Sequence, residues 1–205
     1  MKKLAFVLLL VLITAVPVMA QSMELLPLDS LTGTEPLSIG WADVEDAVEE
    51  SGVSGTLYTV ENDVFGFEIW IPDGLEPSSY ENMYEEDDIC ALFADAEAKQ
   101  RVVVTYRDLQ CDSLEGVVEL LKSNEDAANI RANYTLVNGL ESLLFYFPAQ
   151  DSVNLAIPVT DTWFVQVTVE PVSDQALNAV SGFILASVAP IHEAEPDQQA
   201  LEDAD

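Results

Sequence analysis

The chain has very little positive charge. Its 205 residues include 37 Asp and Glu but only seven Lys and Arg and one histidine, so the formal net charge is −30 at pH 7. Nucleic-acid binding requires a basic surface that neutralises phosphates, and anionic membranes are disfavoured for the same electrostatic reason. We therefore expect no nucleic-acid partner, and cationic peptides, divalent metals and uncharged glycans remain. We interpret the acids as a solvated coat, although adaptation to high salt gives a similar composition.

Residues for catalysis are also scarce. Nucleophilic catalysis needs a base beside the nucleophile, yet the single histidine, His192, follows Pro190 in a tail and neither cysteine has a histidine near it in sequence. Zinc sites use several Cys or His ligands at short spacing, which the chain does not provide. There is no glycine-rich phosphate loop. The sequence thus predicts no catalytic residue, no cofactor and no metal site.

Carboxylates are the exception to this scarcity. With so many acids, a pair at the spacing of a glycosidase is almost inevitable and therefore weak evidence. A small extracellular hydrolase of glycans or peptides that uses paired carboxylates is nevertheless our alternative hypothesis. The run Glu85–Asp88 offers oxygen ligands for calcium, but it lacks the alternating spacing and the glycine of a dedicated loop. We interpret it as a solvated charge run.

Long apolar runs are absent except at the start, "MKKLAFVLLLVLITAVPVMA". A basic beginning, an apolar stretch and small residues before Gln21 are typical of a secretory signal peptide, predicted here over residues 1–20. The apolar stretch of about a dozen residues is shorter than the roughly 20 needed to span a bilayer. We expect a secreted protein without a transmembrane segment.

Only two cysteines, Cys90 and Cys111, are present. Secretion permits a disulfide, and closing a loop of about 20 residues contributes roughly 3 kcal/mol in the chain-entropy model. A plain hairpin, however, does not bring the two residues opposite each other. The alternative is one buried and one exposed thiol, and the sequence leaves both open.

The remaining chain divides into a linker over 21–39, a single α+β domain over 40–190 and an acidic, disordered tail over 191–205. Helical spacing predicts helices beginning near Trp41, at Asp112 as N-cap, and at Ser173 as N-cap. Alternating apolar residues predict strands, and Asn138-Gly139 is typical of a type I′ hairpin turn. The predicted strands cover residues 56–60, 64–71, 89–94, 101–107, 134–137, 140–148, 153–159 and 163–170.

Two of these strands are apolar on both faces. In "LESLLFYFP" and "RVVVTY" both alternating sets are apolar, so both faces must be covered. In "WFVQVTVE", Gln166, Thr168 and Glu170 alternate with apolar residues, which indicates that part of the sheet meets water. We therefore predict an α+β fold with an antiparallel β-sheet sandwiched between helices and incompletely covered.

The order of these segments resembles a known fold group. The "TLYTV…FGFEIWIP" pair, the "SLEGVVELL" helix, the "LVNGLESLLFYFP" hairpin, the "DTWFVQVTVEPVSD" strand and a last helix ending "ILASVAP" are similar to PsbP-like and Mog-like proteins over residues 38–190. The similarity is greatest to small secreted proteins of gut-type Gram-positive bacteria. The resemblance implies an antiparallel sheet between helices and non-enzymatic relatives, such as an extrinsic photosystem subunit or an adaptor for a small GTPase. No ligand-binding residue carries over.

Aromatic residues are the remaining candidates for binding. Trp70 lies on the face of its strand opposite Phe65 and Phe67, and Tyr80 and Tyr84 follow in a polar loop. Exposed rings stack on sugars or anchor protein partners, whereas Trp70 beneath a helix would be core. The hypothesis is a secreted, monomeric, non-catalytic binding or protein-interaction module, whose partner is an unknown protein or glycan at the cell surface.

Overall fold

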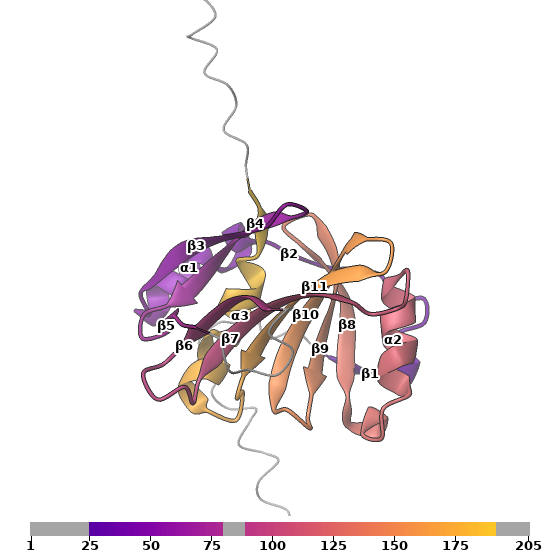
Figure 1. Ribbon diagram of the computed structural model, residues 1–205. Coiled ribbons are helices and arrows are strands. Elements are labelled where there is room, and N and C mark those ends of the chain that lie inside the picture. Colours follow the sequence, from indigo (N-terminus) through magenta and orange to yellow (C-terminus); the bar gives the residue numbers. More distant parts are fainter. Residues whose placement is uncertain (1–24, 80–88, 192–205) are drawn as a thin grey trace, which may run out of the picture.

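The computed structural model describes residues 25–79 and 89–191 (Figure 1). The predicted signal peptide, Tyr80 and Tyr84, the run Glu85–Asp88 and His192 with the tail that follows it lie outside the described residues, so their predictions stay predictions. In the part of the chain that is described, no helix is long and apolar enough to cross a membrane.

A large sheet forms the centre of the molecule. All neighbours along its main path are antiparallel, and β2 (Leu37–Ile39) pairs with β8 in parallel at one end. The order of the path is β1 (Leu26–Pro27), β8 (Arg131–Val137), β9 (Leu140–Phe147), β10 (Ser152–Thr160), β11 (Trp163–Glu170), β7 (Arg101–Asp108), β6 (Ile89–Ala94) and β5 (Glu76–Pro77).

A second, smaller sheet packs near the first. It contains β12 (Ala189–Pro190), β4 (Gly66–Pro72) and β3 (Gly55–Glu61), with β4 in the middle. The helices are α1 (Trp41–Ser51), α2 (Leu114–Lys122) and α3 (Gln175–Ala186), with short 3-10 helices η2 (Leu28–Ser30) and η4 (Ala127–Asn129).

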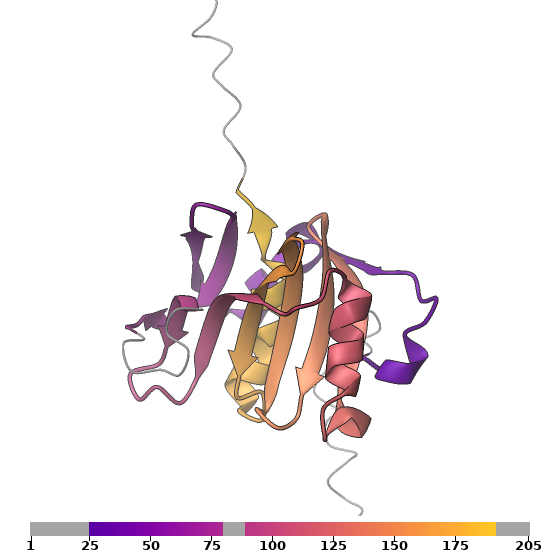
Figure 2. The same cartoon turned by 45° about the vertical axis from the view of Figure 1, so that its right-hand side comes forward.

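The two faces of the large sheet have separate cores. On one face, Val117, Val118 and Leu121 of α2 pack with Leu143 and Phe145 of β9, together with residues from η2. The core of the other face contains residues of α1, α3 and the second sheet, among them Val44, Ile184, Phe67, Ile69 and Val167. Figure 2 shows α2 and η2 on one side of the large sheet and the β3–β4 hairpin on the other.

The α+β class and the mainly antiparallel sheet are therefore confirmed, but the arrangement is not a single sheet between helices. The predicted strands 56–60 and 64–71 are not part of the large sheet and, with β12, form the second one, in which β4 is the largely buried central strand. The segment predicted as linker contributes β1, η2 and β2, which the lack of periodicity concealed. Their pairing with β8 holds them in place.

Two helices begin one residue later than the sequence indicates. Ser113, not Asp112, is the N-cap of α2, and its hydroxyl accepts from the amide of Gly116. Asp174, not Ser173, is the N-cap of α3, and its carboxylate accepts from the backbone amides of Ala176 and Leu177. Either residue of each pair is a good cap by type, so spacing alone does not choose between them.

The polar face of β11 does not simply meet water. Asn154 of β10 is fully buried, and its Oδ1 accepts from Thr168 Oγ1 at 2.8 Å and from Gln166 Nε2 at 2.9 Å. Its Nδ2 donates to Ser152 Oγ at 2.9 Å. Part of the polar face that was expected to meet water is thus a buried hydrogen-bond network, in which the polar side chains are one another's partners. Glu170 instead forms an ion pair with Arg101 at 2.7 Å.

Candidate functional site

The two cysteines form no disulfide with each other. Cys90 lies on β6 and packs against the core that contains α3, whereas Cys111 precedes α2 and packs against the core on the opposite face of the sheet. Both are half-buried, and burial raises the pKa of the Cys111 thiol. The structure therefore has two separate thiols, although not one buried and one exposed thiol, as the alternative to the disulfide predicted.

Trp70 belongs to the core and is not a binding residue. It is 6% exposed, and its ring lies 6.0 Å from that of Trp41 on α1. The prediction that Trp70 lies beneath a helix, here α1, is confirmed. Gly55 is placed opposite the end of this strand because a Cβ there would lie 2.4 Å from the Trp70 indole.

The exposed aromatic surface is formed by other residues. Phe67 stacks on Phe65 with ring centroids 5.8 Å apart, Phe65 contacts Tyr106 at 5.2 Å, and Tyr106 contacts Trp163 at 4.9 Å. We call these four residues the aromatic row. Its exposure rises from 4% at Phe67 to 38% at Trp163, so the row leads from the core between the two sheets out to solvent.

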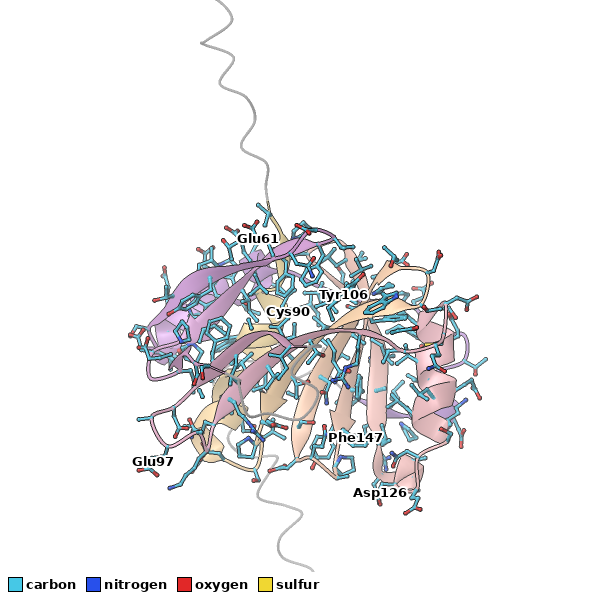
Figure 3. The ribbon with its side chains drawn as sticks, in the orientation of Figure 1. Glu61, Cys90, Glu97, Tyr106, Asp126 and Phe147 are labelled. Carbon is cyan, nitrogen blue, oxygen red and sulfur yellow. The ribbon has the colours of Figure 1, made fainter. Side chains whose placement is uncertain are left out.

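Strand register explains how the row forms. Tyr106 of β7 lies opposite Val165 of β11, and Trp163 lies opposite Asp108, so the two rings are diagonal neighbours on one face of the large sheet. That face is the one towards the β3–β4 hairpin, where Phe65 contacts Tyr106. Figure 3 labels Tyr106 on its strand. The row therefore joins three strands that are distant in sequence.

An apolar hollow of about 210 Å³ adjoins the row. Phe65 and Phe67 form part of its wall, together with residues of β9, β10, β11 and β12. The other apolar wall residues are Leu140, Ile157, Pro158, Val159, Val165 and Pro190. We refer to the aromatic row and this hollow together as the aromatic mouth.

Acidic residues lie around the aromatic mouth. Asp108 is the cross-strand partner of Trp163, Asp161 lies in the turn just before Trp163, and Asp63 lies in the turn that connects β3 and β4. All three are exposed. Aromatic rings beside carboxylates form a surface that attracts cations, because the ring faces and the carboxylates are both negative.

A larger groove lies on the opposite face of the sheet. It has a volume of about 700 Å³ and runs between α2, the segment after η2, and strands β8 and β9. Its carboxylates at Glu115, Glu119 and Glu141 are exposed. Burial raises the pKa of the Tyr134 hydroxyl at its floor, and the charge of Glu115 adds to the effect.

The other polar groups of the groove already have partners. Lys122 Nζ donates to Glu119 Oε1 at 2.8 Å, and this hydrogen bond raises the pKa of Lys122. The hydroxyls of Thr135 and Ser142, two residues that border the groove, are buried and lie 2.8 Å apart. Because these groups satisfy one another, the groove has less unused binding capacity than its size indicates.

Metal ligands do not gather anywhere in the described residues: no group of three or more His, Cys, Asp and Glu there is arranged to hold an ion. Nor is any Asp or Glu among these residues buried. Sequence reasoning did not single out Tyr106 or Trp163. The one available signal was a tryptophan at the start of a strand, directly after the Thr162 turn, where side chains tend to be exposed.

Fold and site together describe a small α+β protein of two packed sheets with an aromatic opening between them. No family model matches the chain, and no curated protein matches it. Among solved structures, the solution structure of cyanobacterial PsbP (CyanoP) from Synechocystis sp. PCC 6803 is similar, with 13% sequence identity and a TM-score of 0.40. The match covers 66% of this chain and 92% of that chain. This similarity transfers no residue role.

Proposed function

We propose that this protein is an exported, non-catalytic binding module of PsbP-like and Mog-like type, which holds a segment of a partner protein at the aromatic mouth. The observation that carries the proposal is the aromatic row, in which the exposed Trp163 ring is supported by rings that continue into the core. Such pre-positioned rings contribute contact area at little entropic cost, which is why aromatic residues dominate binding hot spots.

The chemistry of the mouth favours a partner segment with lysine or arginine side chains. The exposed carboxylates of Asp63, Asp108 and Asp161 attract such a segment, and a cation over an exposed ring is worth about 0.5–1 kcal/mol. An uncharged glycan would stack on the rings and donate hydrogen bonds to the carboxylates, but it would gain no attraction between opposite charges. We therefore place a basic protein segment ahead of a glycan.

The hydrolase alternative has less support. A general acid needs a raised pKa, which usually comes from burial, and every Asp and Glu in the described part of the chain is exposed or only half-buried. Turnover of a glycan or peptide substrate that is lost when one groove carboxylate, such as Glu115, is changed to Gln would favour the hydrolase.

A defined probe tests the proposal. We would titrate the protein with a nine-residue peptide of alternating valine and lysine, with the same peptide carrying glutamate for lysine, and with a neutral glucan oligosaccharide, using calorimetry and tryptophan fluorescence. The lysine peptide should bind most tightly. Trp163→Ala should weaken its binding at least fivefold, since the contact area of the ring is lost together with a cation–ring attraction of about 0.5–1 kcal/mol, whereas Trp163→Phe retains a ring and should stay within threefold.

Two matched variants complete the test. Asp108→Asn keeps the side-chain oxygen that accepts from the Gln110 amide but removes the charge, so it should weaken the lysine peptide and leave the oligosaccharide unaffected. Leu120→Ala changes an apolar residue on α2 that is somewhat more exposed than Trp163, and it should leave binding of both probes unchanged. Equal binding by the wild type and Trp163→Ala would refute the aromatic mouth as the site, and preference for the oligosaccharide would indicate a glycan-binding module.

A further inference from the structure

The second sheet has one outer edge made by a full-length strand. Its order is β12, β4, β3, so β3 has a neighbour on one side only (Figure 1). The other edge strands of the described sheets are different: β1, β5 and β12 have two residues each, of which one is a proline, and β2 has only three residues. Short strands and prolines are the features by which proteins usually close sheet edges to further pairing.

The hydrogen-bond pattern shows which backbone groups of β3 face outward. Asn62 N donates to Phe65 O at one end of the hairpin, and Asp73 N donates to Ser54 O at the other. Hydrogen-bonded pairs alternate along an antiparallel ladder, so the even-numbered residues of β3 bond to β4. The N–H and C=O groups of Gly55, Leu57, Thr59 and Glu61 consequently point away from it.

Two details of β4 agree with this assignment. Pro72, which has no N–H, lies opposite Gly55, where the pattern requires no donor. Trp70 N, opposite Leu57, donates to Ser187 Oγ at 2.8 Å on the far side of β4 instead of to β3. The outward groups of β3 therefore form a regular row, for which no partner is found among the described residues.

This row is accessible and uninterrupted. Leu57 is 54% exposed, and Thr59 and Glu61 are exposed as well. The pairing of β3 with β4 has no register shift over its seven residues, so β3 has neither a bulge nor a proline, and its one charge points to solvent. Such an edge is suited to accept another strand.

Charge determines what kind of strand fits. No Lys, Arg or His occurs between Lys3 and Lys99, and the β3–β4 hairpin carries Glu61, Asp63 and Glu68. A second copy of this chain would bring the same carboxylates against these, which repels it. A strand with basic side chains is attracted instead.

We propose that β3 binds an extended, basic segment of a partner protein as an additional strand of the second sheet. This inference rests on the proposed function, because the strand ends in the turn that leads to Phe65 and so to the aromatic mouth. Backbone hydrogen bonds to Leu57 and Thr59 hold the segment, and its lysine or arginine side chains meet the acids of the hairpin.

Amide hydrogen exchange of the full chain, followed by NMR, tests the proposal with the valine–lysine peptide described above. At saturation the amides of Leu57 and Thr59 should exchange at least tenfold more slowly, while those of Tyr58 and Val60, already bonded to β4, should change little. Thr59→Pro removes an outward donor without removing a bond to β4 and should weaken binding at least tenfold. Thr59→Val keeps the donor and should stay within twofold.

A chemical change in the probe guards against a folding defect in the proline variant. N-methyl groups on alternate residues of the same peptide remove the backbone N–H donors along one edge of the peptide. Methylation of at least one of the two sets, the odd-numbered or the even-numbered residues, should therefore abolish binding to the unchanged protein. Peptide binding that is lost in Trp163→Ala but leaves the β3 amides unprotected would overturn the added strand and keep the aromatic mouth. Slow exchange of Leu57 and Thr59 in a dimer without peptide, at about 0.1 M salt, would also overturn it, as would equal binding of the glutamate peptide.

Discussion

The buried network around Asn154 allows a quantitative test of the large sheet. Asn154→Leu keeps the approximate shape of the side chain and removes three hydrogen bonds at once. Gln166 Nε2 and Thr168 Oγ1 remain 3.2 Å apart and retain each other, but the buried Ser152 hydroxyl loses the partner that the structure gives it. A buried polar group without a partner costs about 1–3 kcal/mol.

We therefore expect Asn154→Leu to lower the free energy of unfolding by about 1–3 kcal/mol, a large share of the 5–15 kcal/mol typical of a domain. Urea denaturation followed by circular dichroism measures this loss. The double variant Asn154→Leu/Ser152→Ala should lose less than the sum of its single variants, because each single change leaves one partner of the Asn154–Ser152 hydrogen bond unpaired and the double change leaves neither. A loss below about 0.5 kcal/mol for Asn154→Leu, or strict additivity, would refute the assignment of this cluster as a coupled buried network.

Three further predictions concern local contacts. Gly55→Ala should destabilise the protein by about 1–3 kcal/mol in the same denaturation assay, since its Cβ would lie 2.4 Å from the Trp70 indole and 2.5 Å from the Ile71 carbonyl oxygen. Changing Trp70 to Phe as well should relieve only the first of these overlaps and so lower the cost only in part. Asp174→Ala should lower the melting temperature at pH 7. The pKa of Asp174 is held below its ordinary value, chiefly by the backbone amide from which it accepts at the start of α3. The carboxylate therefore stabilises the fold fully above the ordinary pKa near 3.9, and this stabilisation disappears as the pH falls through the lowered pKa; a difference in melting temperature that persists at pH 2 would contradict this. Without reductant, iodoacetamide should modify both Cys90 and Cys111 in the denatured protein, as mass spectrometry would show, and modification that requires reductant would indicate the disulfide.

Patterns within one segment predicted the elements of this fold well. The alternation in "FGFEIWIP" is β4, the apolar stripe of residues 114–121 is the buried face of α2, and Asn138-Gly139 forms the turn between β8 and β9, with positive φ at both positions. Each of these signals is local, because it depends on side-chain spacing and on the backbone freedom of the residues concerned.

The errors arise where distant segments decide the outcome. The hairpin of β3 and β4 has the pattern of strands in any sheet, and only its contacts with α3 and β12 show that it belongs to a second one. Residues 25–39 have no periodicity because β1 and β2 are too short to show one. The aromatic row combines residues of β4, β7 and β11, so no single stretch of sequence could indicate it.

The acidity of the chain also explains how an accessible edge strand can persist without pairing to another copy. A regular strand edge normally invites pairing with another copy, and β3 lacks the prolines and the short length that close β1, β5 and β12. A chain of net charge −30 repels its own copies. The same charge keeps other acidic proteins from the β3 edge, but it leaves that edge available to a basic segment. Because salt screens exposed charges, with a Debye length of about 10 Å at 0.1 M and 3 Å at 1 M, raising the salt concentration should weaken binding of the lysine peptide and at the same time increase self-association in sedimentation experiments. Peptide binding and self-association should respond to salt in opposite directions if the same acidic charge attracts the peptide and repels a second copy. If salt weakened or strengthened both, the charge would not be what keeps the β3 edge unpaired.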